Sequence, residues 1–191
     1  MPVMSWIERR FCASAAWQYA GKAVDSLLDR SDIGRNVLEI GCGAGLFADR
    51  LLADRPDATL TAVDLDPHMV QAAADRLHRF PSASVQVADA TNLPFADDSF
   101  DTVISRLMLH HVIDWDLMLA EIARVLRPGG RVLGYDATRN RLWHTIHVLD
   151  GSPFRLAAPT EIRAELAHNH LTPTVDLRWG GQFMTFVGVK G

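Results

Sequence analysis

Five side chains in the second half of the sequence could move a proton or bind a divalent ion. His110 and His111 are adjacent in the stretch SRLMLHHVIDWD, and Asp136 closes a predicted strand further along. His144 and His147 lie three residues apart in HTIH and would share a face if that stretch were helical. Histidine is the side chain best suited to act as a general base near neutral pH. Histidine and aspartate are also common ligands of catalytic metal ions.

A general base is the favoured interpretation of these residues, with His110, His111, His144 and Asp136 as the candidate catalytic residues. Adjacent residues on a helix point about 100° apart, so His110 and His111 are poorly placed to share one metal ion. A divalent-metal site is therefore the less favoured alternative, and a lining or packing role for the pair stays open. The remaining histidines fall on predicted surface helices: His68, His78, His168 and His170.

A glycine loop in the first half of the chain has the composition of a ligand cradle. In LEIGCGAGLFA, Glu39 precedes Gly41, Gly43 and Gly45. Glycine lets the backbone turn tightly and approach a ligand, and the helix that follows offers free N–H groups. The dinucleotide pattern GxGxxG would need glycine where this chain has Leu46, and the Gly-Lys-Ser/Thr of a P-loop is absent.

Two carboxylates follow the glycine loop at the ends of predicted strands. Asp64 lies in the strand 59–65, where its carboxylate can accept hydrogen bonds from both hydroxyls of a ribose. Asp89 closes the strand 83–89 and can accept a hydrogen bond from an exocyclic amino group such as that of adenine. The order glycine loop, first carboxylate, second carboxylate predicts a nucleoside pocket.

The elements that must position these residues alternate between strand and helix. Apolar runs predict five strands, and amphipathic stretches between them predict helices, so the strands should pair in parallel with helices on both faces. Asp66 and Pro67 form a helix start, and Asp114 can cap a later helix that RPGG ends. The predicted strands are 36–41, 59–65, 83–89, 101–105 and 131–136.

The end of the chain follows a different pattern. A helix over 160–170, capped by Thr160, precedes two strands, 174–179 and 182–190, joined at Gly180-Gly181 as a hairpin. The expected fold class is therefore α/β: a Rossmann-like doubly wound sheet of seven strands with an antiparallel C-terminal hairpin.

Two segments lie outside this framework in what we expect to be a single domain, 1–191. Residues 1–30 are expected to form an N-terminal helical cap. Residues 138–159 are expected to be irregular and to act as a variable substrate loop, because ligands bind past the carboxyl ends of parallel strands. Arg139, Arg141 and Arg155 in this segment either bind an anionic or sugar-like acceptor or form a solvated face.

Taken together, these motifs resemble those of class I S-adenosylmethionine-dependent methyltransferases of the small-molecule type found in bacteria. The matching stretches include VLEIGCGAGLFA, AVDLDPHMV, VADATNLPFADDSFDTVIS and LHHVIDWDLMLAEIARVLRPGGRVL, together with the closing hairpin. They cover roughly residues 34–136 and 160–191.

The resemblance implies roles for nine residues that would bind S-adenosylmethionine, with S-adenosylhomocysteine as product. The glycines would hold the methionine moiety, supported by Glu39. Asp64 would bind the ribose. Leu65, Asp89 and Ala90 would contact the adenine, and Ser105 would lie next to the sulfonium.

The resemblance further implies methyl transfer to a small-molecule acceptor, most directly to a hydroxyl of a sugar or specialised metabolite. A hydroxyl must lose its proton, whereas a nitrogen or carbon acceptor needs less help. One alternative is therefore an N- or C-methyltransferase of the same fold. Two others are an NAD(P)-dependent oxidoreductase and a cofactor-binding module without catalysis.

Composition narrows the expected partners and location. A net charge of −4 and an isoelectric point near 6.0 argue against a nucleic-acid partner, because nucleic acids bind to basic protein surfaces. Two cysteines, Cys12 and Cys42, indicate no disulfide framework. The sequence shows neither a signal-peptide pattern nor a run of about 18–20 apolar residues. We therefore expect a cytoplasmic protein without a membrane partner, and the oligomeric state stays open, with a homodimer among the options.

Overall fold

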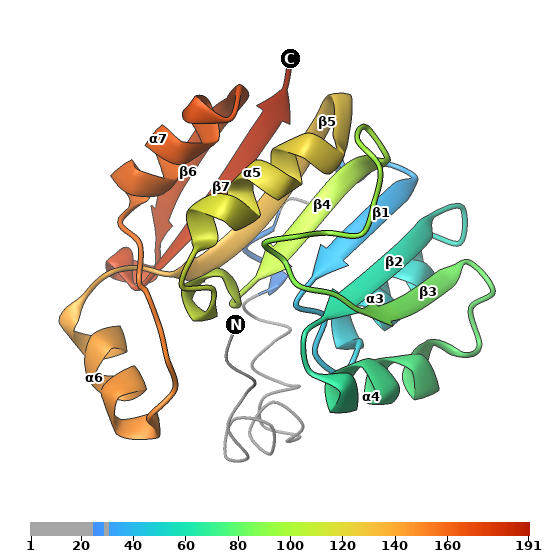
Figure 1. Ribbon diagram of the computed structural model, residues 1–191, viewed down its shortest axis with the longest axis horizontal. Coiled ribbons are helices and arrows are strands. Elements are labelled where there is room, and N and C mark those ends of the chain that lie inside the picture. The colour runs from blue at the N-terminus through green and yellow to red at the C-terminus, as the bar shows by residue number, and fades with distance from the viewer. Residues whose placement is uncertain (1–24, 29–30) are drawn as a thin grey trace.

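The computed structural model describes residues 25–28 and 31–191, so most of the expected cap, 1–30, lies outside the described residues. A seven-stranded sheet forms the centre of this part of the chain (Figure 1), in the order β3-β2-β1-β4-β5-β7-β6. In chain order the strands are β1 Asn36–Ile40, β2 Thr59–Asp64, β3 Ala83–Val87, β4 Phe100–Arg106, β5 Leu126–Ala137, β6 Leu171–Arg178 and β7 Phe183–Lys190.

Strands β1 to β5 pair in parallel, and the last two strands reverse direction. β7 is antiparallel to both β5 and β6, and the η2 turn Trp179–Gly181 joins β6 to β7. Gly180 and Gly181 have φ angles of 65° and 84°, a backbone conformation that favours glycine. The expected Rossmann-like sheet with an antiparallel C-terminal hairpin is therefore confirmed.

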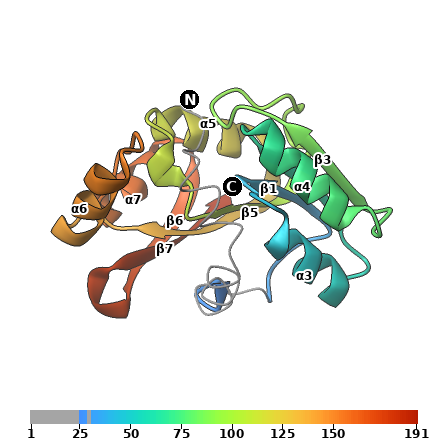
Figure 2. The same ribbon diagram turned by 90° about the horizontal axis from the view of Figure 1, so that it is seen from below.

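Helices cover both faces of the sheet. Figure 2 shows α5 and α7 on one face and α3 on the other. Buried side chains of α5 and α7 pack with β4, β5 and β7, whereas those of α3 and α4 pack with β1, β2 and the other face of β5. The helices are α3 Leu46–Asp54, α4 Pro67–Leu77, the short η1 Leu109–His111, α5 Trp115–Val125, α6 Arg141–Asp150 and α7 Pro159–His168.

Local sequence signals explain several of these boundaries. The Asp66 carboxylate accepts the His68 N–H at 2.9 Å, and Pro67 opens α4, as expected for a capped helix. In the parallel strands the apolar runs are buried on both faces, as with Val37 and Leu38 in β1. Because β1, β2, β4 and β5 pair in parallel, their carboxyl ends meet at one edge of the sheet.

Two details of the helices differ from the sequence-based expectations. The segment 138–159 is not irregular throughout, because Asn140 caps a ten-residue helix, α6, by accepting the Trp143 N–H at 3.0 Å. Helix α7 begins at Pro159 with Ala158 as its N-cap, so the expected cap at Thr160 is wrong. The Glu161 side chain instead accepts the Ala158 N–H at 2.7 Å, which satisfies a donor that would otherwise be left open at this helix start.

Strand limits also shift slightly. β3 ends at Val87, so Asp89 lies beyond it, in an isolated bridge with Asn92. β5 starts earlier than expected, at Leu126, which pairs with Phe100 before a register shift. Across residues 25–28 and 31–191, no helix is both long enough and apolar enough to span a membrane.

Candidate functional site

The glycine loop between β1 and α3 forms an open cradle at the carboxyl edge of the sheet. The N–H groups of Gly41 and Cys42 both donate to the Val63 carbonyl, at 2.8 and 3.0 Å. A methyl group added at Gly41 would lie 2.7 Å from Met108 Cγ, so this position requires glycine. At Gly43, where φ is 52°, an added methyl would meet nothing within 4 Å. The loop therefore packs closely on one side and is open on the other.

Asp64 at the end of β2 holds the cradle in place. Its Oδ2 accepts the Gly43 N–H at 2.9 Å and its Oδ1 accepts the Asp66 N–H at 3.0 Å. Burial raises the pKa of this carboxyl, against the effect of the two N–H donors. A carboxylate has about four acceptor positions, so Asp64 can still accept from a ligand. Leu65, the next residue, is half-buried.

Asp89 lies on the neighbouring connection. Its Oδ1 accepts both the Thr91 N–H at 2.8 Å and the Thr91 hydroxyl at 2.7 Å. Burial alone would raise the pKa of Asp89, but these bonds outweigh it and lower the pKa below the usual value. No described residue bonds to Oδ2, which leaves that oxygen for a ligand, and Ala90 beside it is buried.

A buried charge network that the sequence did not reveal braces the floor of the cradle. Arg106 at the end of β4 donates to Glu39 Oε1 at 2.7 Å and to Asp25 Oδ1 at 2.7 Å. Tyr135 also donates to Asp25 Oδ1, at 2.8 Å. Burial alone would lower the pKa of Arg106, but the carboxylates of Glu39 and Asp25 raise it, so the guanidinium stays charged.

This network joins the ends of three strands and attaches residues 25–28 to the sheet. Arg50 from α3 also contacts Asp25, and the Arg106 guanidinium lies 4.4 Å from the centre of the Phe47 ring. Glu39, two residues before Gly41, is thus held by Arg106, and its support of the glycine loop stays a prediction. Asp25 and Arg106 follow no short motif, and only the folded chain brings them together.

Ser105 lies at the centre of this edge. It pairs in register with Ile40 of β1 and Gly134 of β5 and is fully buried. Its hydroxyl makes no hydrogen bond to any described residue. A buried hydroxyl of this kind is available to a ligand that reaches the end of β4.

His110 and Asp136 form a buried pair at the carboxyl end of β5, the strand next to that of Ser105. The Asp136 carboxylate accepts the Leu109 N–H at 2.8 Å and the Ala137 N–H at 2.7 Å, and Oδ1 also contacts His110 Nδ1. Asp136 has no exposed surface and His110 only 5%. Three polar contacts to one carboxylate fix the orientation of the imidazole. A proton shared on the Nδ1 side leaves Nε2 as an acceptor.

His111 and His147 complete a cluster of three imidazoles around this pair. The ring centre of His110 lies 4.1 Å from that of His111 and 4.8 Å from that of His147. His110 and His111 lie in the short 3-10 helix η1, which follows Leu107, a residue with a φ of 47°. Their rings are thus close together although the two residues are adjacent in a helical turn. Residues 25–28 and 31–191 contain no group of three or more His, Cys, Asp or Glu side chains arranged to hold a metal ion.

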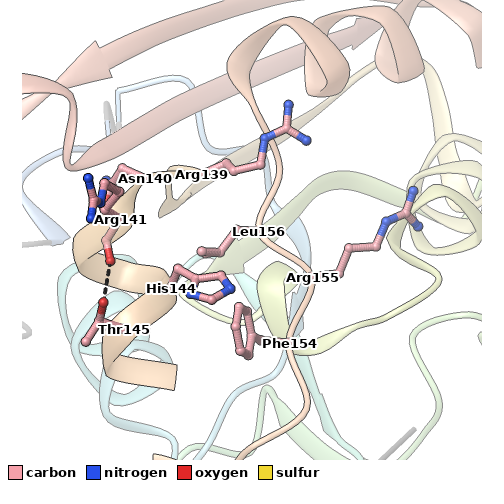
Figure 3. Close-up of a pocket in the computed structure, with 8 residues that line it drawn as sticks. All are labelled: Arg139, Asn140, Arg141, His144, Thr145, Phe154, Arg155 and Leu156. Carbon is pink, nitrogen blue, oxygen red and sulfur yellow. Dashed lines mark hydrogen bonds between the residues drawn. The ribbon is translucent and has the colours of Figure 1, made fainter. Parts of the chain in front are cut away.

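Helix α6 thus contributes His147, and not His144, to the cluster. His144 is exposed and contacts Phe154 instead, with ring centres 5.5 Å apart (Figure 3), whereas His147 is buried. Phe154 in turn lies 5.0 Å from His147. The helical spacing of HTIH was the sequence signal for His147, but the face of α6 that packs inwards could not be chosen without the fold.

A second, outer pocket opens between α6 and the segment before α7 (Figure 3). Its volume is about 750 Å³. We call it the arginine pocket because three of its eight described lining residues are arginines. The lining consists of Arg139, Asn140, Arg141, His144, Thr145, Phe154, Arg155 and Leu156.

Comparison with known proteins gives a consistent result. Residues 38–134 match the protein family described as "Methyltransferase domain". The chain is 37% identical over 134 residues to a phthiotriol/phenolphthiotriol dimycocerosates methyltransferase of Mycobacterium ulcerans, an alignment that covers 70% of this chain and 49% of that one. It is 36% identical over 121 residues to a fatty-acid O-methyltransferase of Mycolicibacterium smegmatis, covering 63% of this chain and 44% of that one. The chain thus spans about half the length of these relatives.

Solved structures share the fold at low sequence identity. A SAM-dependent methyltransferase from Aquifex aeolicus superposes with a TM-score of 0.74 at 14% identity and covers 99% of this chain and 100% of that one. Human N-acetylserotonin methyltransferase in complex with SAM superposes with a TM-score of 0.72 at 21% identity, over 92% of this chain and 53% of that one.

Proposed function

The chain belongs to the methyltransferase domain family, and from that membership we propose that it binds S-adenosylmethionine and transfers its methyl group to a hydroxyl of a small molecule. The observation that carries the proposal is the gathering of the glycine cradle, Asp64, Asp89 and the His110–Asp136 pair at one edge of the sheet. Family membership removes the main support for the alternative of a nicotinamide oxidoreductase.

The residues present fit this cofactor. The open side of Gly43 leaves room for the methionine moiety, and Asp64 has acceptor capacity left for the ribose hydroxyls. Asp89 Oδ2 and the backbone of Ala90 would read the adenine edge, with Leu65 packed on its face. Ser105 would lie next to the sulfonium. When bound, S-adenosylmethionine supplies an electrophilic methyl group on a positively charged sulfur.

The protein's own contribution is to orient the acceptor, exclude water and accept its proton. His110 Nε2 would take the proton of the acceptor hydroxyl. Asp136 would hold the ring through Nδ1 and stabilise the imidazolium that forms, as in other histidine–carboxylate pairs. His111 and His147 would line the acceptor side of the site, so that the acceptor hydroxyl would contact imidazole rings.

The acceptor class follows from the relatives only as a proposal. Two of them are named for lipid substrates, a fatty acid and dimycocerosates. We therefore extend the proposal to an acceptor with an apolar body, methylated in the cytoplasm and without a nucleic-acid partner. N-methylation or C-methylation by the same site is the alternative.

Calorimetric titration with S-adenosylhomocysteine tests the cofactor part. We expect one binding site per chain with a micromolar dissociation constant, about −8 kcal/mol. Replacing Asp64 by Asn removes charge from the ribose acceptor and should weaken binding at least tenfold. Asp57→Asn, a matched change of an exposed carboxylate that pairs with Arg55, should leave binding unchanged. Absence of binding to the unaltered chain would rule the proposal out.

Methyl transfer itself is tested with isotope-labelled S-adenosylmethionine. We would supply alkyl and sugar alcohols alongside the matching amines and follow the label into product by mass spectrometry. Labelling of the alcohols supports O-methylation. Labelling confined to the amines would overturn the hydroxyl assignment while keeping the methyltransferase assignment.

A further inference from the structure

The arginine pocket is unusual in a chain with a net charge of −4. Its eight described lining residues include three arginines and a histidine but no aspartate or glutamate. The pocket therefore offers positive charge on a molecule that is negative overall. The proposed cofactor does not account for this, since its contacts lie on the glycine cradle, Asp64 and Asp89.

Two of the arginines are held in place by the surrounding structure. Arg155 donates to Asp116 Oδ1 and to the Ile113 carbonyl, both at 2.8 Å, and its guanidinium lies 4.5 Å from the centre of the Trp115 ring. Arg139 donates to Glu161 Oε1 at 2.9 Å. Their side chains are still 46% and 57% exposed. Each guanidinium has five N–H donors, so donors remain for a ligand.

Arg141 differs from the other two. It follows the Asn140 cap at the start of α6, and its side chain makes no hydrogen bond or ion pair within the described residues. The backbone N–H groups of the first helical turn add further positive potential at this point. The pocket thus has two partly neutralised arginines and one whose charge is not balanced by a neighbour.

Besides the arginines and the polar residues Asn140 and Thr145, the lining contains apolar and aromatic side chains on the side towards the imidazole cluster. Phe154 and Leu156 form the inner wall, and His144 faces Phe154 (Figure 3). From Phe154, ring contacts continue to His147 at 5.0 Å and from His147 to His110 at 4.8 Å. A ligand with its charged group among the arginines would therefore place an apolar body against Phe154 and Leu156, on the side from which these ring contacts continue.

We propose that the arginine pocket binds a carboxylate or phosphate group of an amphiphilic acceptor, at a distance from the atom that receives the methyl group. Guanidinium groups match both anions with paired hydrogen bonds, which a neutral head group cannot form as strongly. That this ligand is the methyl acceptor rests on the proposed function. Anion binding by the pocket is a separate property and can be measured without turnover.

The test is a calorimetric titration of the full chain, saturated with S-adenosylhomocysteine, with decyl phosphate, decanoate and decanol. These probes share one alkyl chain and differ in head group. We expect decyl phosphate and decanoate to bind at least tenfold more tightly than decanol. Inorganic phosphate alone should bind more weakly than decyl phosphate. The preference for the charged probes should shrink as salt increases, because part of the site is exposed.

Variants locate the effect. Arg141→Gln should reduce the preference for charged probes to about threefold or less, and Arg141→Lys should retain most of it. Arg35→Gln removes an equally charged side chain, 81% exposed, from the opposite edge of the sheet and should change nothing. A preference that survives in Arg141→Gln would overturn the assignment, because the anion would then bind elsewhere.

Two further outcomes would contradict the proposal. Equal affinity for decanol and decyl phosphate would show that the pocket does not select charge. Equal affinity for inorganic phosphate and decyl phosphate would show that the apolar wall contributes nothing, so that the ligand is not amphiphilic. A separate titration with S-adenosylhomocysteine reports on the proposed function. If that ligand does not bind but the probes still bind to the chain alone with the same preference, the proposed function is rejected and the anion site stands.

Discussion

Among single residues, the His110–Asp136 pair matters most for the proposed proton transfer. One buried carboxylate accepts two backbone N–H groups and contacts one imidazole, so its geometry is fixed before any substrate binds. Preorganised groups of this kind lower the barrier to proton transfer because they need little rearrangement. The pair joins η1 to the end of β5 through two residues that are 26 positions apart in the sequence.

We predict that His110→Gln lowers kcat by about a hundredfold to ten-thousandfold for a hydroxyl acceptor, the usual contribution of a general base. Affinity for S-adenosylhomocysteine should change by less than threefold, because His110 does not form the cofactor cradle. Steady-state kinetics and calorimetry on the same sample separate the two effects. His78→Gln, an exposed histidine at the end of α4, serves as the control.

Full turnover in His110→Gln would contradict the base assignment. The same kinetic series with His111→Gln, His144→Gln and His147→Gln would then identify the base among the neighbouring histidines. The sequence predicted His110, Asp136 and the cofactor residues from local motifs. It could not predict the packing of His147 against His110, because that contact depends on which face of α6 turns inwards.

At the scale of elements, the connection that carries Asp89 is held by α5. Arg124 donates to the carbonyls of Phe95 at 2.7 Å and Leu93 at 3.0 Å, while Glu121 accepts from Arg124 and from the Leu93 N–H, both at 2.7 Å. This clamp satisfies backbone groups of a connection that has no strand partner over most of its length. It therefore fixes the segment that follows the proposed adenine contact.

We predict that Glu121→Gln destabilises the protein by about 1–3 kcal/mol at neutral pH, because a charge-assisted pair with Arg124 is lost. The Arg124 guanidinium holds the pKa of Glu121 below its usual value of 4.5. The pair therefore contributes stability above about pH 4.5, and that contribution is lost as the pH falls through the lowered pKa.

Urea unfolding at neutral and at acid pH checks this prediction. The difference between the unaltered protein and Glu121→Gln should be largest at neutral pH and should shrink in acid. Asp75→Asn, an exposed carboxylate on α4, should show a much smaller difference at both pH values. A difference for Glu121→Gln that does not depend on pH would mean that the charge of Glu121 is not what stabilises the clamp.

Periodicity in the sequence predicted the strands and helices through residue 136 and the closing hairpin, because each carries a buried apolar pattern of its own. It failed at α6. The apolar residues Leu142, Ile146 and Leu149 of this helix are exposed, whereas Trp143 and His147 face inwards. A helix whose exposed face is apolar does not show the usual amphipathic pattern, although the Asn140 cap was present in the sequence.

In the whole molecule, the parallel and the antiparallel parts of the sheet have different roles. Strands β1 to β5 bring the glycine cradle, Asp64, Ser105 and Asp136 to one edge, and the antiparallel pair β6 and β7 extends the platform on which α6 rests. Trp143 of α6 donates to the Gln182 carbonyl at 2.8 Å and packs against Phe183, with ring centres 5.2 Å apart. The hairpin thus positions the helix that contributes His147 and lines the arginine pocket.

We predict that S-adenosylhomocysteine raises the free energy of unfolding of the whole chain. S-adenosylhomocysteine at about a hundred times its dissociation constant should add about 2.7 kcal/mol, which corresponds to a rise in Tm of about 5–10 °C. Differential scanning calorimetry measures the shift. In Asp64→Asn the same ligand concentration should give a clearly smaller rise, and an equal rise would mean that Asp64 does not hold the ligand.

A crystal structure of the full chain with S-adenosylhomocysteine tests the proposed site most directly. We expect the homocysteine moiety on the glycine cradle, the ribose on Asp64, the adenine beside Asp89, and the sulfur next to Ser105 with the open side of His110 facing it. A ligand bound away from the cradle, or a sulfur remote from the His110–Asp136 pair, would show that the proposed site is wrong.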